Sequence, residues 1–522
     1  MTPPTPQDRA APRGRNHAPE RPGPRPLRAR WLVVGAAALA TGCAVGPDFK
    51  APAAPTVSGY TPEPLPAETA SAEVPGGAAQ RFELGADISA QWWALFQSPA
   101  LNALVERSLK ANPNIQAAQA ALKVALETVY AQQGAYFPEI DGNFSPSRNK
   151  TSNSIAPVPA NNSNIYSLYT AQLSLSYAPD VFGLNRRTVE SLQAQAENQR
   201  FQLEATYLTL TSNVVAAAIQ EASLRAQIKA TEDIIAIERE LLALLRKQLE
   251  LGAVAGLDFA AQEAALAQAE ATLPPLQKQL DQQRDLLAAL SGAFPSDEPA
   301  ERFELATFKL PQGLPVSLPS KLVEQRPDVR AAEALLQSAS AQIGVAVANR
   351  LPNLTLSAAV GSQALSSGAL FGPGNAIWSV GASLTAPLFD GFTLLHRERA
   401  ARAAFDQAAA QYKSTVITAF QNVADTLRAL QSDADALRAQ LAAERAAKTS
   451  LDIARRQLEL GQINYLALLN AQQTYLQAVI NLAQAQANRY ADTAGLFQAL
   501  GGGWWNRPDQ PQTALSIRNV LP

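Results

Sequence analysis

Two uninterrupted helical patterns dominate the chain. Residues 184–251 and 393–460 form two stretches of equal length that contain neither glycine nor proline. Within them, apolar side chains recur at alternating spacings of three and four residues, the pattern of a packed helical seam. One such series comprises Phe420, Val423, Leu427, Leu430, Ala434, Leu437 and Leu441. Because each continuous helix would measure roughly 100 Å, these stretches predict a helical bundle or coiled coil rather than globular helices.

Between the helical stretches, polarity alternates residue by residue. Residues 354–360 and 378–384 place apolar side chains at even positions and small or polar ones between them. Residues 169–177 do the same with apolar side chains at odd positions. This alternation predicts strands with one apolar and one polar face, within about 139–178 and 353–386.

The two halves of the chain repeat one another. Pro113 and Pro138 are matched by Pro327 and Pro352, with the same spacing and similar neighbours in both copies. Further along, the pentapeptide Gln-Leu-Glu-Leu-Gly at 248–252 recurs without change at 457–461. Several such pairs in one order indicate a tandem duplication. The predicted division is repeat 1 at 92–292, a linker at 293–318, repeat 2 at 319–502 and a C-terminal tail at 503–522, with the proline-rich linker and tail expected to be irregular.

The N-terminal region has the pattern of an export signal. Arginines and prolines fill residues 1–30, an apolar run follows at 31–40, and small residues then precede Cys43, the only cysteine. The apolar run is too short to span a bilayer, and no stretch of 18 apolar residues follows Cys43. Small residues before a cysteine at this place resemble the bacterial lipobox, in which the thiol is acylated. We therefore expect a signal peptide at 1–42 and a lipidated linker from Cys43 to residue 91; an ordinary signal peptide with an incidental cysteine is the alternative.

Composition and charge narrow the class of protein. Apolar residues make up 47% of the chain, aromatic residues only 7% and charged residues 17%. Much of the apolar content is alanine, which favours closely packed long helices over a bulky core. The net charge of −2 gives no reason to expect nucleic acid as a partner.

Four amphipathic strands in one chain cannot close a membrane barrel, because single-chain barrels need eight or more. Either their edges pair with other copies of the chain, or the strands form a small soluble sheet. Two copies would give eight strands with a filled interior, whereas three would give twelve and leave a passage. Identical interfaces closing a ring are the expected symmetry.

A set of motifs resembles the outer-membrane efflux proteins, or TolC-like channels, and specifically the NodT-type lipoproteins of tripartite RND efflux systems. The motifs are Cys43-Ala-Val-Gly-Pro-Asp-Phe49, Trp92-Trp93-Ala-Leu-Phe96, Ala111-Asn-Pro-Asn114, Tyr136-Phe-Pro138, Ala386-Pro-Leu-Phe-Asp-Gly391 and Ala499-Leu-Gly-Gly-Gly-Trp504. The resemblance implies a mainly α, tandem-duplicated fold with four strands per chain in a trimeric 12-stranded barrel, a long periplasmic α-helical barrel and a mixed equatorial belt. It also implies a passive homotrimeric exit duct, anchored by lipid in the outer membrane, with a periplasmic adaptor and an inner-membrane pump as partners. The motifs do not indicate which compound is exported.

Each long helical stretch ends at a glycine, Gly252 or Gly461, which suits a helix C-cap before a short turn. The resemblance implies a periplasmic gate at these turns, closed by polar contacts between helices. Asp258 matches an acidic position of that gate. Alternatively, its carboxylate stabilises the N-terminus of the returning helix.

In the second repeat, Asn464, Tyr465 and Asn470 are expected to form a hydrogen-bonded constriction. Some relatives carry two aspartates around the pore where this chain has Ala467 and Asn470, so an acidic ring is not expected. In the first repeat, Pro274-Pro275 is expected to interrupt the returning helix and to bend it near the belt.

Enzymatic chemistry is not indicated. Of the two histidines, His17 lies in the predicted signal and His396 stands among charged residues at a helix start. The sequence shows no metal-ligand spacing, phosphate loop or nucleophile arrangement, so no cofactor is expected. Two other classes remain as alternatives, a periplasmic adaptor and a structural coiled-coil lipoprotein. The first should contain a lipoyl-like β-rich region, and the second should lack the strands.

Overall fold

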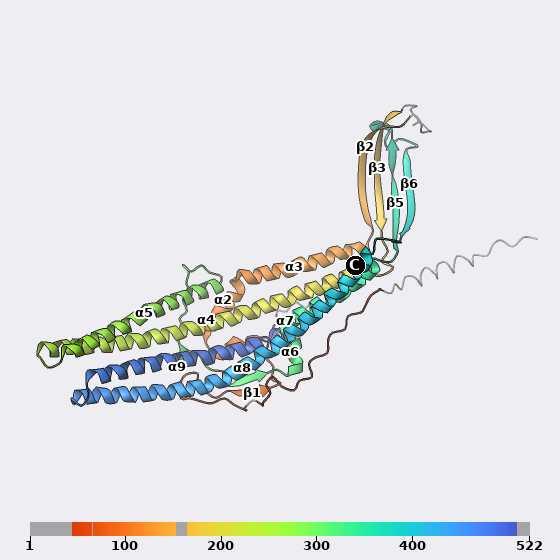
Figure 1. Cartoon of the computed structure of the whole chain (residues 1–522). Coiled ribbons are helices and arrows are strands. Elements are labelled where there is room, and N and C mark those ends of the chain that lie inside the picture. Colours follow the sequence, from red (N-terminus) through yellow and green to blue (C-terminus); the bar gives the residue numbers. More distant parts are fainter. Residues whose placement is uncertain (1–43, 65, 153–163, 509–522) are drawn as a thin grey trace, which may run out of the picture.

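The computed structural model describes residues 44–64, 66–152 and 164–508, and it shows a long helical bundle with a small sheet at one end (Figure 1). Cys43, the predicted signal peptide and residues 509–522 lie outside the described residues. The helices are α2 (Pro99–Ala111), α3 (Pro113–Gln133), α4 (Leu184–Glu250), α5 (Gly256–Leu290), α6 (Pro319–Gln325), α7 (Pro327–Ala348), α8 (Thr393–Glu459) and α9 (Tyr465–Ala499). The strands are β1 (Arg81–Leu84), β2 (Glu139–Lys150), β3 (Ile165–Tyr177), β4 (Gly313–Val316), β5 (Asn353–Ala364) and β6 (Ala376–Thr385). Short 3-10 turns lie at Trp92–Phe96, Gly134–Tyr136, Leu305–Thr307, Ser367–Ala369 and Trp504–Asn506.

The tandem-duplicated, mainly helical fold is confirmed. Helices α4 and α8 each contain 67 residues, and the returning helices α5 and α9 each contain 35. One and the same offset along the sequence relates α4 to α8 and α5 to α9. The turns at the far tips pass through Gly252 (φ +70°) and Gly461 (φ +69°), left-handed conformations that glycine adopts without steric penalty.

The helices pack side by side along most of their length (Figure 1). Helix α4 lies against α3, α5, α7 and α9, and α8 lies against α7 and α9. The predicted seam of α8 is buried at Val423, Leu427, Leu430, Ala434, Leu437 and Leu441. Buried alanines such as Ala218 and Ala487 add to the core, because a methyl side chain lets neighbouring helix axes approach closely.

The sheet at the other end contains four antiparallel strands in the order β2-β3-β5-β6. Its register aligns the apolar positions of all four strands. One row across the sheet is Ile140, Leu175, Ala358 and Val380, and the adjacent apolar row is Gly142, Leu173, Val360 and Trp378. The row between them is polar or small: Asp141, Ser174, Ala359 and Ser379.

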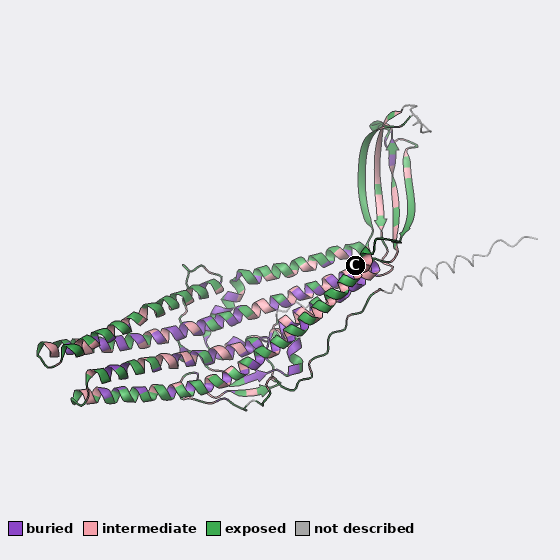
Figure 2. Ribbon diagram, viewed as in Figure 1, coloured by how far each residue is buried: buried purple, intermediate pink, exposed green. Residues whose placement is uncertain are grey.

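Much of this sheet is exposed in the single chain (Figure 2), and the exposed residues include apolar ones. Trp378 is 78% exposed and Val380 is 77% exposed. Strands β2 and β6 each have one neighbour, so both edges of the sheet are open. A single copy therefore leaves both an apolar face and two hydrogen-bonding edges without cover.

Two sequence-based expectations about the linker and the first returning helix were wrong. The linker at 293–318 was expected to be irregular, but β4 within it pairs in parallel with β1, because Leu314 and Val316 are buried in the main core. Pro274 and Pro275 do not interrupt α5, which is one continuous helix. Packing against the neighbouring helices on both sides of the two prolines holds α5 together, with Ala269 before them and Leu287 after them buried.

Among the described residues, no helix has both the length and the apolar composition that crossing a membrane requires.

Candidate functional site: helix tips, equatorial clamps and strand junction

The two hairpin tips are tied together by one hydrogen bond. The hydroxyl of Tyr465, at the start of α9, donates to Gln248 Oε1 near the end of α4, at 2.7 Å. Burial raises the pKa of Tyr465, and the nearby negative charge of Asp258 raises it further. The structure therefore brings Asp258, Tyr465 and Gln248 to one place, where repeat 1 meets repeat 2.

The other two predicted gate residues take no part in this hydrogen bond. Asn464 is the N-cap of α9, and its side chain accepts a hydrogen bond from Ala467 N at 3.0 Å. Asn470 is exposed on α9. Gln248 was missed by sequence reasoning, although it opens the pentapeptide that both repeats share.

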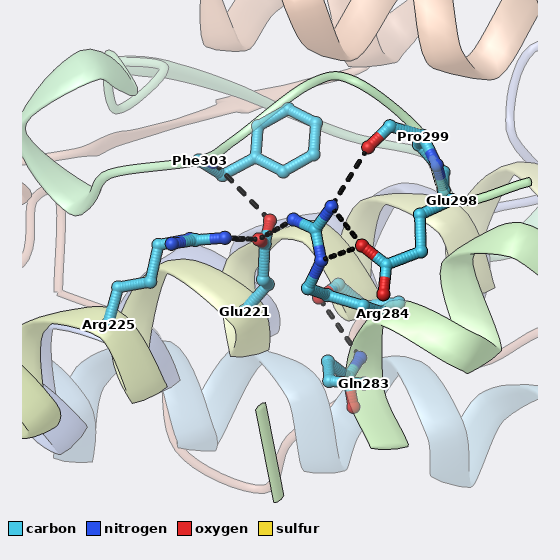
Figure 3. A network of polar contacts seen from close by, with 8 residues as sticks. Glu221, Arg225, Gln283, Arg284, Glu298, Pro299 and Phe303 are labelled. Carbon is cyan, nitrogen blue, oxygen red and sulfur yellow. Dashed lines mark hydrogen bonds and ion pairs between the residues drawn. The ribbon is translucent and has the colours of Figure 1, made fainter. Parts of the chain in front are cut away.

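A fully buried carboxylate, Glu221, lies midway along α4 and forms the centre of a clamp (Figure 3). Arg225 contacts it at 2.6 Å and Arg284 of α5 at 3.1 Å, and the backbone N–H of Phe303 donates to it at 3.3 Å. Arg284 also donates to Glu298 and to the carbonyl of Pro299. This clamp, the Glu221 clamp, holds linker residues 298–303 against the first hairpin.

A second clamp, of opposite charge, lies on the second hairpin. Arg489 of α9 is fully buried. Its guanidinium donates to Thr69 Oγ1 and to the carbonyl of Ala78, both at 2.8 Å, and to the carbonyl of Leu430 on α8 at 3.5 Å. This Arg489 clamp holds residues 69–78, which precede β1.

The two clamps occupy related places in the duplication. At the offset that relates α4 to α8, Glu221 corresponds to Leu430 and Arg284 corresponds to Thr493. Each clamp holds one irregular segment. The segment at 69–78 leads into β1, the segment at 298–303 leads toward β4, and these two strands pair with each other. The clamps thus fix these two segments and the β1–β4 pair, which together we call the belt, to the helical bundle.

The first described residues of the chain are fastened where the strands join the helices. Arg187 of α4 is buried and donates to the carbonyl of Val45 at 3.0 Å and to Asp48 at 2.8 Å. Val45 N donates in turn to the carbonyl of Phe182 at 3.1 Å. Gly46 has φ +94°, and a Cβ there would lie 2.4 Å from Gly344 Cα. Only glycine fits this crossing.

The corresponding junction of repeat 2 is uncovered and strained. Gly183 (φ +76°) is the N-cap of α4, whereas the N-cap of α8 is Phe392 (φ +68°). Leu388 is 96% exposed and Phe389 is 82% exposed. A bulky side chain in a left-handed backbone conformation is costly, and here it presents an aromatic ring at the surface.

The described residues contain no group of three or more His, Cys, Asp or Glu side chains that could hold a metal ion. What the described residues offer is a long helical bundle, a four-stranded sheet with two open edges and polar contacts at the helix tips.

Comparison with known proteins identifies the class. The family model described as "Outer membrane efflux protein" matches residues 104–293 and 318–502, so the chain belongs to the outer membrane efflux protein family. Members of this family are outer-membrane channels rather than enzymes.

Individual relatives match over nearly their whole length. The antibiotic efflux pump outer membrane protein ArpC of Pseudomonas putida is 29% identical over 483 residues, covering 91% of this chain and 96% of that protein. The toluene efflux pump outer membrane protein TtgC, also from Pseudomonas putida, is 29% identical with the same coverage.

Solved structures agree with the fold. The outer-membrane channel OprN is 26% identical, with a TM-score of 0.78, covering 88% of this chain and 100% of that chain. The CmeC outer membrane channel of Campylobacter jejuni has a TM-score of 0.81 at 22% identity, covering 90% of this chain and 97% of that chain. At this identity the likeness supports the fold alone.

Proposed function

We propose that this protein is the exit duct of a tripartite efflux pump, a passive homotrimeric channel that carries small molecules across the outer membrane. The observation that carries the proposal is the sheet register. It places apolar side chains of four neighbouring strands on one face and leaves both sheet edges open. Such a sheet becomes stable in a membrane only when its edges pair with other copies.

Three copies satisfy this requirement. Four strands from each of three chains make a 12-stranded barrel, with the apolar face toward lipid and the polar face toward an aqueous interior. The helices continue the ring, since α3, α4, α7 and α8 lie side by side in that order. A continuous helical barrel would then form if α8 of one copy packed against α3 of the next.

Lipid anchoring at Cys43 is part of the proposal. Cys43 immediately precedes Ala44, and an added Cβ on Gly183 would lie only 2.7 Å from Ala44. Gly183 begins α4, next to the end of the strands. An acyl chain on Cys43 would therefore start at the level where the barrel wall gives way to helices, near the inner leaflet of the outer membrane.

The proposed gate comprises Asp258, Asn464, Tyr465 and Asn470, with Gln248 as a further member. Tyr465 and Gln248 hold the two hairpins together, and Asp258 adds a negative charge beside them. Asn464 fixes the turn by capping α9, and Asn470 presents its amide on the exposed surface of that helix. The names of the relatives, which are outer-membrane proteins of efflux pumps, support a periplasmic adaptor and an inner-membrane pump as partners, and the proposal places their contact at these tips.

Two experiments test the proposal. Membrane fractionation should find a heat-modifiable trimer in the outer membrane, labelled by radioactive palmitate unless Cys43 is changed to alanine. A monomer in the soluble periplasm would favour an adaptor or a structural coiled-coil lipoprotein. In planar bilayers, the double variant Asp258→Ala with Asn470→Ala should raise single-channel conductance, and unchanged conductance would remove both residues from the gate.

A further inference from the structure

The two hairpins can be compared position by position, because one offset relates α4 to α8 and α5 to α9, and the paired helices have equal lengths. At two buried positions near the tips, the first hairpin has polar side chains where the second has alanine. Glu238 and Gln262 are 2% and 0% exposed in the first hairpin, where the second has Ala447 and Ala471, at 6% and 9%. The first hairpin therefore buries a carboxyl and an amide where the second buries two methyl groups.

The buried pair has an imbalance of acceptors over donors. Gln262 Nε2 donates to the backbone carbonyl of Glu238 at 3.3 Å, which fixes the amide beside the root of the glutamate side chain. Glu238 Oε2 and Gln262 Oε1 are both buried and make no hydrogen bond with other described residues. Both of these atoms are acceptors when the glutamate is ionised. Leaving two buried acceptors unpaired is unfavourable.

One proton removes the imbalance. A neutral Glu238 can donate its O–H to Gln262 Oε1, while the amide keeps its bond to the Glu238 carbonyl. An ionised Glu238 has no proton to give: the second N–H of the amide is the one donor that the pair offers to its carboxylate, and Gln262 Oε1 then has no donor within the pair. We propose that Glu238 and Gln262 form a proton-dependent lock between α4 and α5, closed when Glu238 is neutral and open when it is ionised.

The surroundings of Glu238 provide no competing charge. Burial is the cause that raises its pKa. On the same two helices, Arg239 pairs with Glu270 instead, and Asp233 pairs with Lys229. On the facing second hairpin, the charged groups are Glu444, Asp452 and Arg455. Together with Asp233 of the first hairpin, they affect the pKa of Tyr475 on α9.

The direction of the effect follows from this shift. Because the folded-state pKa of Glu238 is raised, its stabilising contribution is full at low pH and is lost as the pH rises through that raised value. The first hairpin should tighten on acidification and loosen toward alkaline pH. The second hairpin, with Ala447 and Ala471, should not respond. That this loosening eases opening of the channel rests on the function proposed above; the lock itself does not.

Hydrogen exchange of the purified full-length protein in detergent, from pH 5 to pH 8, tests the lock. Residues 235–265 are compared with 444–474, the matching segment of the second hairpin, after correction for intrinsic exchange rates. In the wild type, exchange of the first segment relative to the second should rise with pH, by at most about tenfold per pH unit because one group binds one proton.

Three variants make the test specific. Glu238→Gln keeps a donor for Gln262 at every pH, so it should abolish the pH dependence and hold the slow exchange of the acidic state. The double variant Glu238→Ala with Gln262→Ala reproduces the second hairpin and should also be flat. Glu263→Gln, an exposed neighbour on α5, should retain the wild-type dependence.

The lock is overturned if Glu238→Gln titrates like the wild type, or if both segments of the wild type respond equally. Conductance in planar bilayers is measured separately on the same variants. A hairpin that responds to pH without any change in conductance would contradict the link to gating while leaving the lock intact.

Discussion

Replacing Arg284 by methionine should release the linker from the Glu221 clamp. The change removes a cation that is 11% exposed from a carboxylate that is 0% exposed, and it also removes the bonds to Glu298 and Pro299. Breaking a buried ion pair typically costs about 3–5 kcal/mol, because one charge stays buried without its partner. Arg225 still contacts Glu221, so we expect the lower end, about 3 kcal/mol.

The backbone amide of Phe303 is the direct reporter, since its N–H donates to Glu221. A loss of about 3 kcal/mol should speed its hydrogen exchange roughly a hundredfold, because every 1.4 kcal/mol is a factor of ten. The chain offers a matched control in Arg239→Met. That arginine also joins α4 to α5 through Glu270, but the two side chains are 63% and 41% exposed, and such pairs contribute about 0–1 kcal/mol.

A compensated variant tests the reasoning itself. Glu221→Leu combined with Arg284→Thr introduces the residues that repeat 2 has at these positions, Leu430 and Thr493. Removing both charges should restore most of the stability that Arg284→Met loses, since the penalty comes from an unpaired buried charge. If Arg284→Met costs no more than the Arg239→Met control, the clamp does not hold the linker.

Three further changes probe the tip, the strained junction and the belt. Tyr465→Phe removes the bond to Gln248, worth about 0.5–1.5 kcal/mol, so open probability in planar bilayers should rise up to about tenfold; an unaltered value would exclude this contact from gating. Phe392→Gly relieves a left-handed conformation worth roughly 1–2 kcal/mol and should raise the melting temperature, whereas a lower one would show that the exposed ring is needed. Arg107 donates two hydrogen bonds to Glu301 and lowers the pKa of that carboxyl. This contribution is present above the ordinary glutamate pKa and is lost as the pH falls through the lowered value, so exchange near residue 301 should accelerate in acid, but not in Glu301→Gln.

The long elements could be predicted because their signals are redundant. A stretch as long as 184–251 without glycine or proline leaves few alternatives to a helix, and α4 and α8 end one residue before the predicted limits. The strands follow from period-two alternation, which the register then aligns across the sheet. In each case many residues carry the same information.

The clamps could not be predicted, because single charged residues in a helix are usually exposed. Glu221 and Arg489 look like surface positions of alanine-rich helices. One signal was present: Glu221 corresponds to Leu430, which the seam of the second repeat had already placed in a core. The β1–β4 pair gave no such signal, since two very short strands that lie on either side of the whole first repeat leave no local pattern.

The opposite charges of the two clamps also bear on how a duplicated chain avoids misfolding. Each irregular segment meets two hairpins of nearly the same shape, so docking on the wrong one is a real hazard. Glu221 accepts a hydrogen bond from the backbone N–H of Phe303, whereas Arg489 donates to Thr69 and to the carbonyl of Ala78. The segment at 69–78 offers the acceptors of Thr69 and Ala78 to the arginine; placed at Glu221, it would bring oxygen to oxygen inside the protein. A buried charge of a different sign in each half, each with an uncharged residue at the matching position of the other half, thus directs each segment to its own hairpin.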